Sequence, residues 1–188
     1  MLGKRGGMLI CICLFMMLNA CATTVNNSAQ GNVAASKANV KLGLAYLARK
    51  QIPNAKESLL LAVEESPRSV TALNALAYYW ESTGNTKNAL ADYKKALSIK
   101  PNSGRGQNNF GAFLCEQGSY KMAIYYLLKA ANNKNYMFTA AAYENAGICS
   151  LKAGNKAKAI KYLKHALLED PARIKSLRLL KRLGVYTQ

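Results

Sequence analysis

The chain has 188 residues, of which 26 are Lys or Arg and 9 are Asp or Glu, so its formal net charge is +17. A basic excess of this size makes nucleic acid the first partner to consider, but the sequence carries no recognisable nucleic-acid-binding module. Its single histidine excludes a histidine-based triad or metal cluster, and the sequence has no phosphate-binding G-x-x-x-x-G-K-[ST] loop. We therefore expect no enzymatic activity, no cofactor, no metal site and no small-molecule substrate.

Residues 1–20 are expected to form an export signal. Lys4 and Arg5 give a basic start, and Met8–Leu18 is an almost unbroken apolar run, too short to cross a bilayer as a helix. The run ends in the letters LNAC, which resemble a bacterial lipobox, where the leader is cut before a cysteine that is then acylated. The resemblance implies a covalent lipid on Cys21. The alternative is an ordinary signal peptide cut nearby.

The residues after the cysteine indicate where the protein resides. In lipoprotein sorting an Asp after the acylated cysteine favours the inner membrane, so Ala22 predicts a lipid anchor on the periplasmic face of the outer membrane. Residues 21–35 are small and polar without helical periodicity, and we expect the acylated cysteine and a flexible tether there. Loss of the leader lowers the net charge from +17 to +15 by removing Lys4 and Arg5. Because the chain is exported, we expect no nucleic-acid partner.

Four copies of one pattern occupy residues 36–173. Pro67 and Pro101 are 34 residues apart, and an apolar residue followed by Gly or Ala, then evenly spaced small and large apolar positions, recur around them. Three copies also carry a turn glycine. The pattern resembles the tetratricopeptide repeat, a helix–turn–helix unit of 34 residues. The copies are expected at 36–69, 70–103, 104–137 and 140–173, the last displaced by two residues, with a capping helix and tail at 174–188.

A single unit of this kind cannot bury its apolar face, so the copies must stack. We predict an all-α fold, a right-handed superhelix whose first helices line a concave surface and whose second helices face outward. Most lysines fall on the second helices, which is typical of a solvated outer face. Attraction of that face to anionic headgroups, peptidoglycan or an acidic partner is the alternative.

Two cysteines follow Cys21, at positions 12 and 10 of successive first helices. Residues two apart on a helix point about 200° apart. If Cys115 faces the next first helix, Cys149 therefore faces back toward it. In an oxidising periplasm this opposed facing predicts a Cys115–Cys149 disulfide. The alternative is two buried free thiols that act as small hydrophobes.

The concave face offers a candidate partner groove. Positions 5, 9 and 12 are all apolar in the first repeat and mostly polar in the next two. An apolar start to a groove favours capture of an amphipathic or extended segment of a partner protein. We expect the three apolar side chains to face solvent, unless the tether, or Val33 within it, folds back over them. The candidate groove residues are Val40, Leu44, Leu47, Asn74, Tyr78 and Asn108.

More particular strings occur in the last two copies, NNFGAFLCEQG at 108–118 and AAYENAGICSLKAGN at 141–155. With the lipobox and tether, they resemble the PilF/PilW family of type IV pilus biogenesis lipoproteins. The resemblance implies an outer-membrane pilotin that binds the secretin subunit of the type IV pilus and promotes its outer-membrane targeting and ring assembly. Members of the family usually continue for further repeats, whereas Gln188 here follows one amphipathic helix.

Two other functions stay open. One is an outer-membrane tetratricopeptide lipoprotein that acts as an adaptor for cell-wall or envelope-assembly machinery. The other is a periplasmic chaperone-like module that binds unfolded chains. These two hypotheses differ from the pilotin hypothesis in the partner that the protein binds, and all three predict the same fold.

Overall fold

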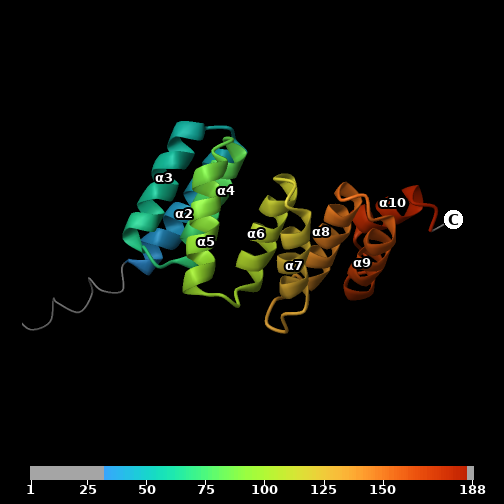
Figure 1. The fold of residues 1–188 in the computed structure, drawn as a ribbon. Coiled ribbons are helices and arrows are strands. Elements are labelled where there is room, and N and C mark those ends of the chain that lie inside the picture. Colours follow the sequence, from blue (N-terminus) through green and yellow to red (C-terminus); the bar gives the residue numbers. More distant parts are fainter. Residues whose placement is uncertain (1–31, 186–188) are drawn as a thin grey trace, which may run out of the picture.

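The computed structural model describes residues 32–185, so the expected leader, Cys21 and most of the expected tether lie outside the described residues. Within this range the chain forms four antiparallel helix pairs and one further helix, with no strand, which confirms the all-α solenoid (Figure 1). No helix in this range is both long and apolar enough to cross a membrane. The helices are α2 (Val33–Ala48), α3 (Ile52–Glu65), α4 (Val70–Ser82), α5 (Thr86–Ile99), α6 (Gly104–Glu116), α7 (Tyr120–Ala131), α8 (Thr139–Lys152), α9 (Lys156–Glu169) and α10 (Ile174–Arg182).

The helices begin at polar caps that the sequence supplies. Ser69 and Ser103 each accept a hydrogen bond from the backbone N–H three residues on, at 3.2 Å. Asn32 caps α2 in the same way, and its own N–H donates to the Glu65 carbonyl at 2.8 Å. This cap starts α2 at Val33, three residues before the expected start of the first repeat at residue 36. Val33 therefore lies in the first turn of α2 and does not fold back over the groove.

Each helix pair closes around a small residue that faces a large one. Gly111 in α6 is an example, since a Cβ there would lie 2.7 Å from Leu127 Cγ and 3.0 Å from the Ala123 carbonyl oxygen. A side chain at this position would push α6 away from α7. In the second pair the small residue is Ala77, and the large partner is the buried Tyr93.

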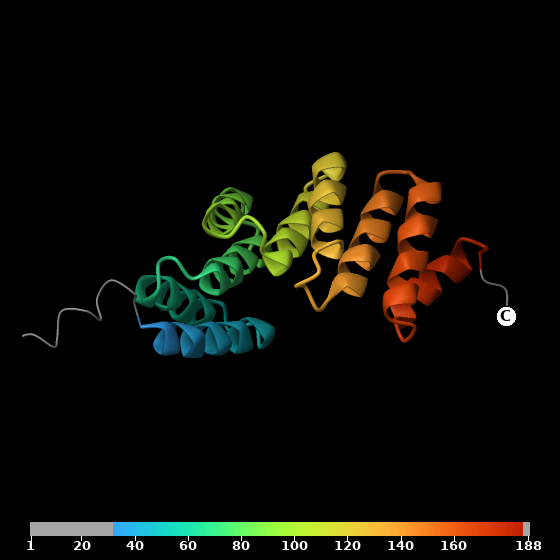
Figure 2. The same cartoon turned by 90° about the horizontal axis from the view of Figure 1, so that it is seen from below.

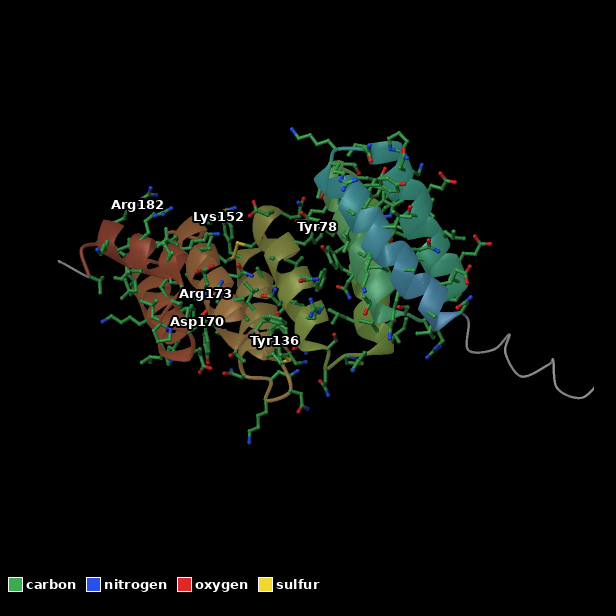
Figure 3. The ribbon with its side chains drawn as sticks, turned by 180° about the vertical axis from the view of Figure 1, so that it is seen from behind. Tyr78, Tyr136, Lys152, Asp170, Arg173 and Arg182 are labelled. Carbon is green, nitrogen blue, oxygen red and sulfur yellow. A yellow bond between two sulfur atoms is a disulfide. The ribbon has the colours of Figure 1, made fainter. Side chains whose placement is uncertain are left out.

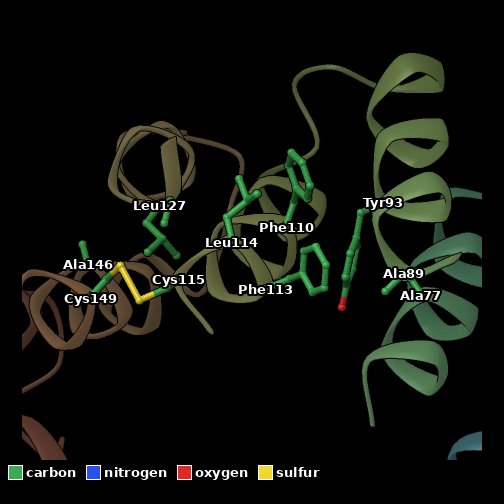
Figure 4. Close-up of a cluster of buried hydrophobic side chains, with 11 residues drawn as sticks. Ala77, Ala89, Tyr93, Phe110, Phe113, Leu114, Cys115, Leu127, Ala146 and Cys149 are labelled. Atoms are coloured by element: carbon green, nitrogen blue, oxygen red, sulfur yellow. A yellow bond between two sulfur atoms is a disulfide. The ribbon is translucent and has the colours of Figure 1, made fainter. Parts of the chain in front are cut away.

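Neighbouring pairs stack with a twist, as Figure 2 shows from below. Figure 1 separates α2–α5 from α6–α10, and aromatic side chains fill the space between these groups (Figure 4). Tyr93 from α5 lies 5.3 Å from Phe113 and 6.0 Å from Phe110, measured between ring centroids. The core therefore continues from the second pair into the third.

The connection between α7 and α8 is longer than the repeat pattern allows, because two extra residues fall there. Tyr136 packs against the start of α6, where a Cβ on Gly104 would lie 2.5 Å from Tyr136 Cβ. Met137 and Phe138 follow, and both are exposed. The displacement of the fourth copy is thus absorbed in this loop.

Candidate partner groove

An open apolar hollow lies at the tip of the first helix pair. It has a volume of about 510 Å³ and is formed by the end of α2, the α2–α3 turn and the last turns of α4. Three of the predicted residues, Leu44, Leu47 and Tyr78, meet there. The remaining lining residues are Ala48, Lys50, Ile52 and Ser82.

Two of these side chains are open to solvent. Leu44 is 37% exposed and Tyr78 is 49% exposed, although both are large and apolar in character. Leu47 is half-buried and packs against the core of the first two repeats. The hollow therefore has a floor fixed by packing and walls that a partner segment can reach.

Lys50 forms an unusual rim for the hollow. It occupies the α2–α3 turn, where the other three pairs place Gly84, Gly118 or Gly154, and it is the one non-glycine residue with positive φ in the described range, at 59°. A side chain in this left-handed conformation costs conformational energy that glycine avoids. The turn thus holds a basic side chain at the groove at some cost to stability. Lys50 and Ile52 are not among the predicted groove residues. The lack of a turn glycine in the first repeat is the sequence feature that distinguishes the position of Lys50.

Two predicted groove residues are wrong. Val40 is only 6% exposed and lies in the core with Ala72 and Leu76 of α4. Although Val40, Leu44 and Leu47 share one face of α2, α4 crosses that face and covers its first part. Asn74 is also buried, and its Nδ2 donates to the Val70 carbonyl one turn earlier at 2.7 Å.

Asn108 lies apart from the hollow, on the concave side of the third repeat. Its Oδ1 accepts a hydrogen bond from Asn145 Nδ2 at 3.0 Å, which links α6 to α8. Further along the same two helices, Lys152 and Glu116 form an ion pair at 2.6 Å. The predicted groove is therefore an apolar hollow in the first two repeats and a separate polar surface in the last two.

A half-buried carboxylate, that of Glu81, lies in the last turn of α4. Tyr93 donates a hydrogen bond from its hydroxyl to Glu81 Oε2 at 2.8 Å. Burial raises the pKa of Glu81 above its ordinary value and outweighs the effect of this hydrogen bond. Burial beside this carboxylate also raises the pKa of Tyr93. The pair thus ties α4 to α5 with a hydrogen bond at the inner side of the second repeat.

The structure joins Cys115 of α6 to Cys149 of α8 in a disulfide, with their Cα atoms 5.7 Å apart. This separation is in the usual range for a disulfide. Both side chains are buried beside Ala146 and Leu127 in the same core cluster (Figure 4). Within residues 32–185, no group of three or more His, Cys, Asp or Glu side chains is placed to hold a metal ion.

The chain matches the family model described as tetratricopeptide repeat at residues 40–104, and a second such model at 140–173, the range expected for the fourth copy. An uncharacterised protein of Haemophilus influenzae is 30% identical over 140 residues, which cover 74% of this chain and 78% of that protein. The type IV pilus assembly protein PilF of Pseudomonas aeruginosa is 36% identical over 138 residues, which cover 73% of this chain. The matched part spans 55% of that relative, about half its length.

Two solved structures are similar. One comes from the functional characterisation of Pseudomonas aeruginosa PilF, with 33% identity and a TM-score of 0.72, covering 79% of this chain and 69% of that one. The other is PilW, described as a widely conserved type IV pilus biogenesis factor, with 29% identity, a TM-score of 0.74, and coverage of 79% and 68%.

The fold and the repeat matches define a class of helical scaffold, the tetratricopeptide-repeat proteins. Within that class, the identity to PilF over more than two thirds of its solved chain is decisive. This chain belongs to the PilF/PilW family of type IV pilus biogenesis proteins.

Proposed function

We propose that this protein is a lipid-anchored, non-enzymatic scaffold that supports type IV pilus biogenesis by binding the secretin subunit and promoting its outer-membrane targeting and ring assembly. Membership of the PilF/PilW family supports the pilus role. The observation that carries the proposal is the open apolar hollow formed by Leu44, Leu47 and Tyr78. A tetratricopeptide solenoid presents surface, and in this hollow of the described surface apolar side chains from two repeats converge on a cavity.

The chemistry of the hollow suits a short segment of another protein. Leu44 and Ile52 offer aliphatic contact, and Tyr78 offers a ring with a polar end. Lys50 at the rim favours a partner segment with an acidic residue or a carboxylate beside its apolar anchor. An amphipathic helix or an extended strand of the secretin meets these requirements.

The anchor part of the proposal depends on Cys21, which lies outside the described residues. A single acyl chain gives only marginal membrane binding, so stable retention needs the several chains that bacterial lipoproteins carry. Anchoring would hold the bound secretin subunit at the outer membrane, where the ring assembles.

Leu44→Asp tests the groove, with Leu42→Asp as its matched control on another face of α2. Both leucines are exposed to a similar degree, 37% and 45%, so each change should alter the free energy of unfolding by only about 0.5 kcal/mol. Leu44→Asp should abolish co-purification of the secretin subunit and reduce assembled rings, because it places a charge in the apolar hollow. Leu42→Asp should leave both unchanged.

The outcomes separate the parts of the proposal. Normal secretin capture and normal rings with Leu44→Asp would show that the partner binds elsewhere. A second arm uses Cys21→Ser, which should release the protein from the outer-membrane fraction. Retention of that variant after a salt wash would contradict the anchor while leaving the groove result untouched.

A further inference from the structure

The α7–α8 loop exposes two apolar side chains, Met137 and Phe138, and hydrogen bonds hold the loop in place. Met137 is 88% exposed and Phe138 is 47% exposed. The loop beneath them is held in place, since Asn133 Nδ2 donates to the Asn102 carbonyl at 2.9 Å and Asn133 Oδ1 accepts from the Asn135 N–H at 3.0 Å. Tyr136 packs against Gly104, as described above, and its ring lies 5.8 Å from that of Phe138. The tip therefore projects from a rigid base.

Two further exposed apolar residues flank the α9–α10 connection, which lies on the same side of the solenoid as this loop (Figure 1). Leu168 in the last turn of α9 is 77% exposed, and Ile174 at the start of α10 is 68% exposed. Thr139, which follows the loop, donates a hydrogen bond to Glu169 Oε2 at 3.1 Å and so holds the end of α9 beside it. Met137, Leu168 and Ile174 are the most exposed large apolar residues in the described part of the chain.

Basic side chains border these apolar residues. Lys100, Arg105 and Lys134 are all exposed, and the Arg105 guanidinium lies 5.4 Å from the centre of the Phe138 ring. The acidic groups here are Glu169, which accepts from Thr139, and Asp170, whose carboxylate lies 3.9 Å from Arg173. We call this surface the Met137 edge, and its members are Lys100, Arg105, Lys134, Tyr136, Met137, Phe138, Leu168 and Ile174.

The Met137 edge lies on the side of the solenoid from which the N-terminal chain departs. Figure 1 shows the start of α2 and the α5–α6, α7–α8 and α9–α10 connections all toward its lower side. In Figure 3, Tyr136 and Asp170 lie on that lower side, whereas Tyr78 lies higher. A lipid anchor that precedes Asn32 would therefore join the described chain on this side, and the partner groove would stay accessible.

We propose that the Met137 edge docks onto the phospholipid surface, with Met137 and Phe138 inserted at the headgroup–acyl boundary and the basic side chains against anionic headgroups. Apolar and aromatic tips bordered by Lys and Arg are the combination that the membrane interface favours, because the long basic side chains reach the headgroups while the apolar tips enter the lipid. Met137 and Phe138 also line an open hollow of about 360 Å³, but Met137, at 88% exposure, stands almost wholly in solvent, as a side chain that inserts into lipid must. The inference rests on the proposed membrane location and adds an orientation to it.

Vesicle binding tests this contact without the lipid anchor. The chain from Ala22 onward contains every described helix and lacks Cys21, so it binds only through its own surface. It should float with vesicles of phosphatidylethanolamine and phosphatidylglycerol, and less with vesicles of phosphatidylcholine alone. High salt should weaken the binding, because exposed charges are screened.

The decisive variant is Met137→Ser with Phe138→Ser, which should lower the apparent vesicle affinity by about tenfold through loss of inserted apolar surface. The matched control is Met122→Ser with Tyr125→Ser on α7, whose side chains are 50% and 54% exposed and lie outside the edge. This control should bind as the parent chain does, and thermal melting should show that both variants stay folded.

Three outcomes would overturn the proposal: no vesicle binding by the parent chain, equal loss in both double variants, or full binding by the Met137 and Phe138 variant. If the Met137→Ser, Phe138→Ser variant loses secretin capture while its vesicle binding is unchanged, the Met137 edge is instead a protein-binding site. A failed lipid anchor would not affect these results, because the tested chain has none. The two proposals therefore fail separately.

Discussion

Tyr93, Phe110 and Phe113 pack between α5 and α6, whereas a disulfide and an amide pair join α6 to α8. The second and third repeats thus meet through apolar packing centred on aromatic rings, and the third and fourth through a covalent bond added to packing. The repeat frame is the same on both sides. What differs is the side chain that each repeat offers at the junction.

These two junctions show two ways in which a solenoid holds neighbouring repeats together. Each repeat contacts only its neighbours, so the weakest junction decides whether the whole array unfolds in one step. The aromatic junction depends on volume and fit, and a truncated side chain leaves a cavity that the helices fill only in part. The disulfide junction depends on a bond that packing defects do not break.

Tyr93→Ala should have the largest effect, because it removes the ring that bridges the two halves and leaves Glu81 without its hydroxyl donor. We expect a loss of about 3–5 kcal/mol in the free energy of unfolding. Urea unfolding followed by circular dichroism should also become less cooperative. Tyr125→Ala, at an exposed position of α7, should change stability by only about 0.5 kcal/mol. A small, cooperative change with Tyr93→Ala would mean that the aromatic junction is not the critical one.

Cys115→Ala with Cys149→Ala should cost about 2–4 kcal/mol, because the cross-link between residues 34 apart no longer restricts the unfolded chain. Chemical reduction of the unaltered protein should have a similar effect on the urea midpoint. Thiol labelling of denatured, unreduced protein should find both cysteines unreactive. Full labelling of both would show that the bond is absent in the cell.

Glu144→Gln should have the smallest effect of the three, at the ionic junction between α8 and α10. The Glu144 carboxylate accepts hydrogen bonds from Arg173 at 2.9 Å and from Ser176 at 2.7 Å. Burial opposes its ionised form, but these hydrogen bonds and the Arg173 charge hold the pKa of Glu144 below its ordinary value of 4.5. The change should cost about 1.5–3 kcal/mol at neutral pH.

The pH dependence of that cost checks its cause. Because the folded pKa is lowered, the stabilisation is full above the ordinary pKa of 4.5 and is lost as the pH falls through the lowered folded value. The difference in unfolding free energy between wild type and Glu144→Gln should therefore shrink in acid. A difference that stays constant across this range would assign the effect to packing rather than to charge.

Much of this arrangement was predictable from the sequence. Helix pairs and their order follow from the 34-residue period, and the opposed facing of Cys115 and Cys149 follows from helix geometry. Val40 was misplaced because a shared face on α2 does not show where α4 crosses it. The role of the α7–α8 loop was also missed. The two extra residues were visible, but only the packing of Tyr136 against Gly104 shows that Met137 and Phe138 project.

Burial of the disulfide limits the rate at which it can be reduced, in addition to the effect of the bond on stability. Cys149 is fully buried and Cys115 nearly so, and a reductant must reach a sulfur atom directly to attack it. Reduction therefore has to wait until α6 and α8 part. The rate at which a dilute thiol reduces the bond therefore measures how often the contact between α6 and α8 opens locally.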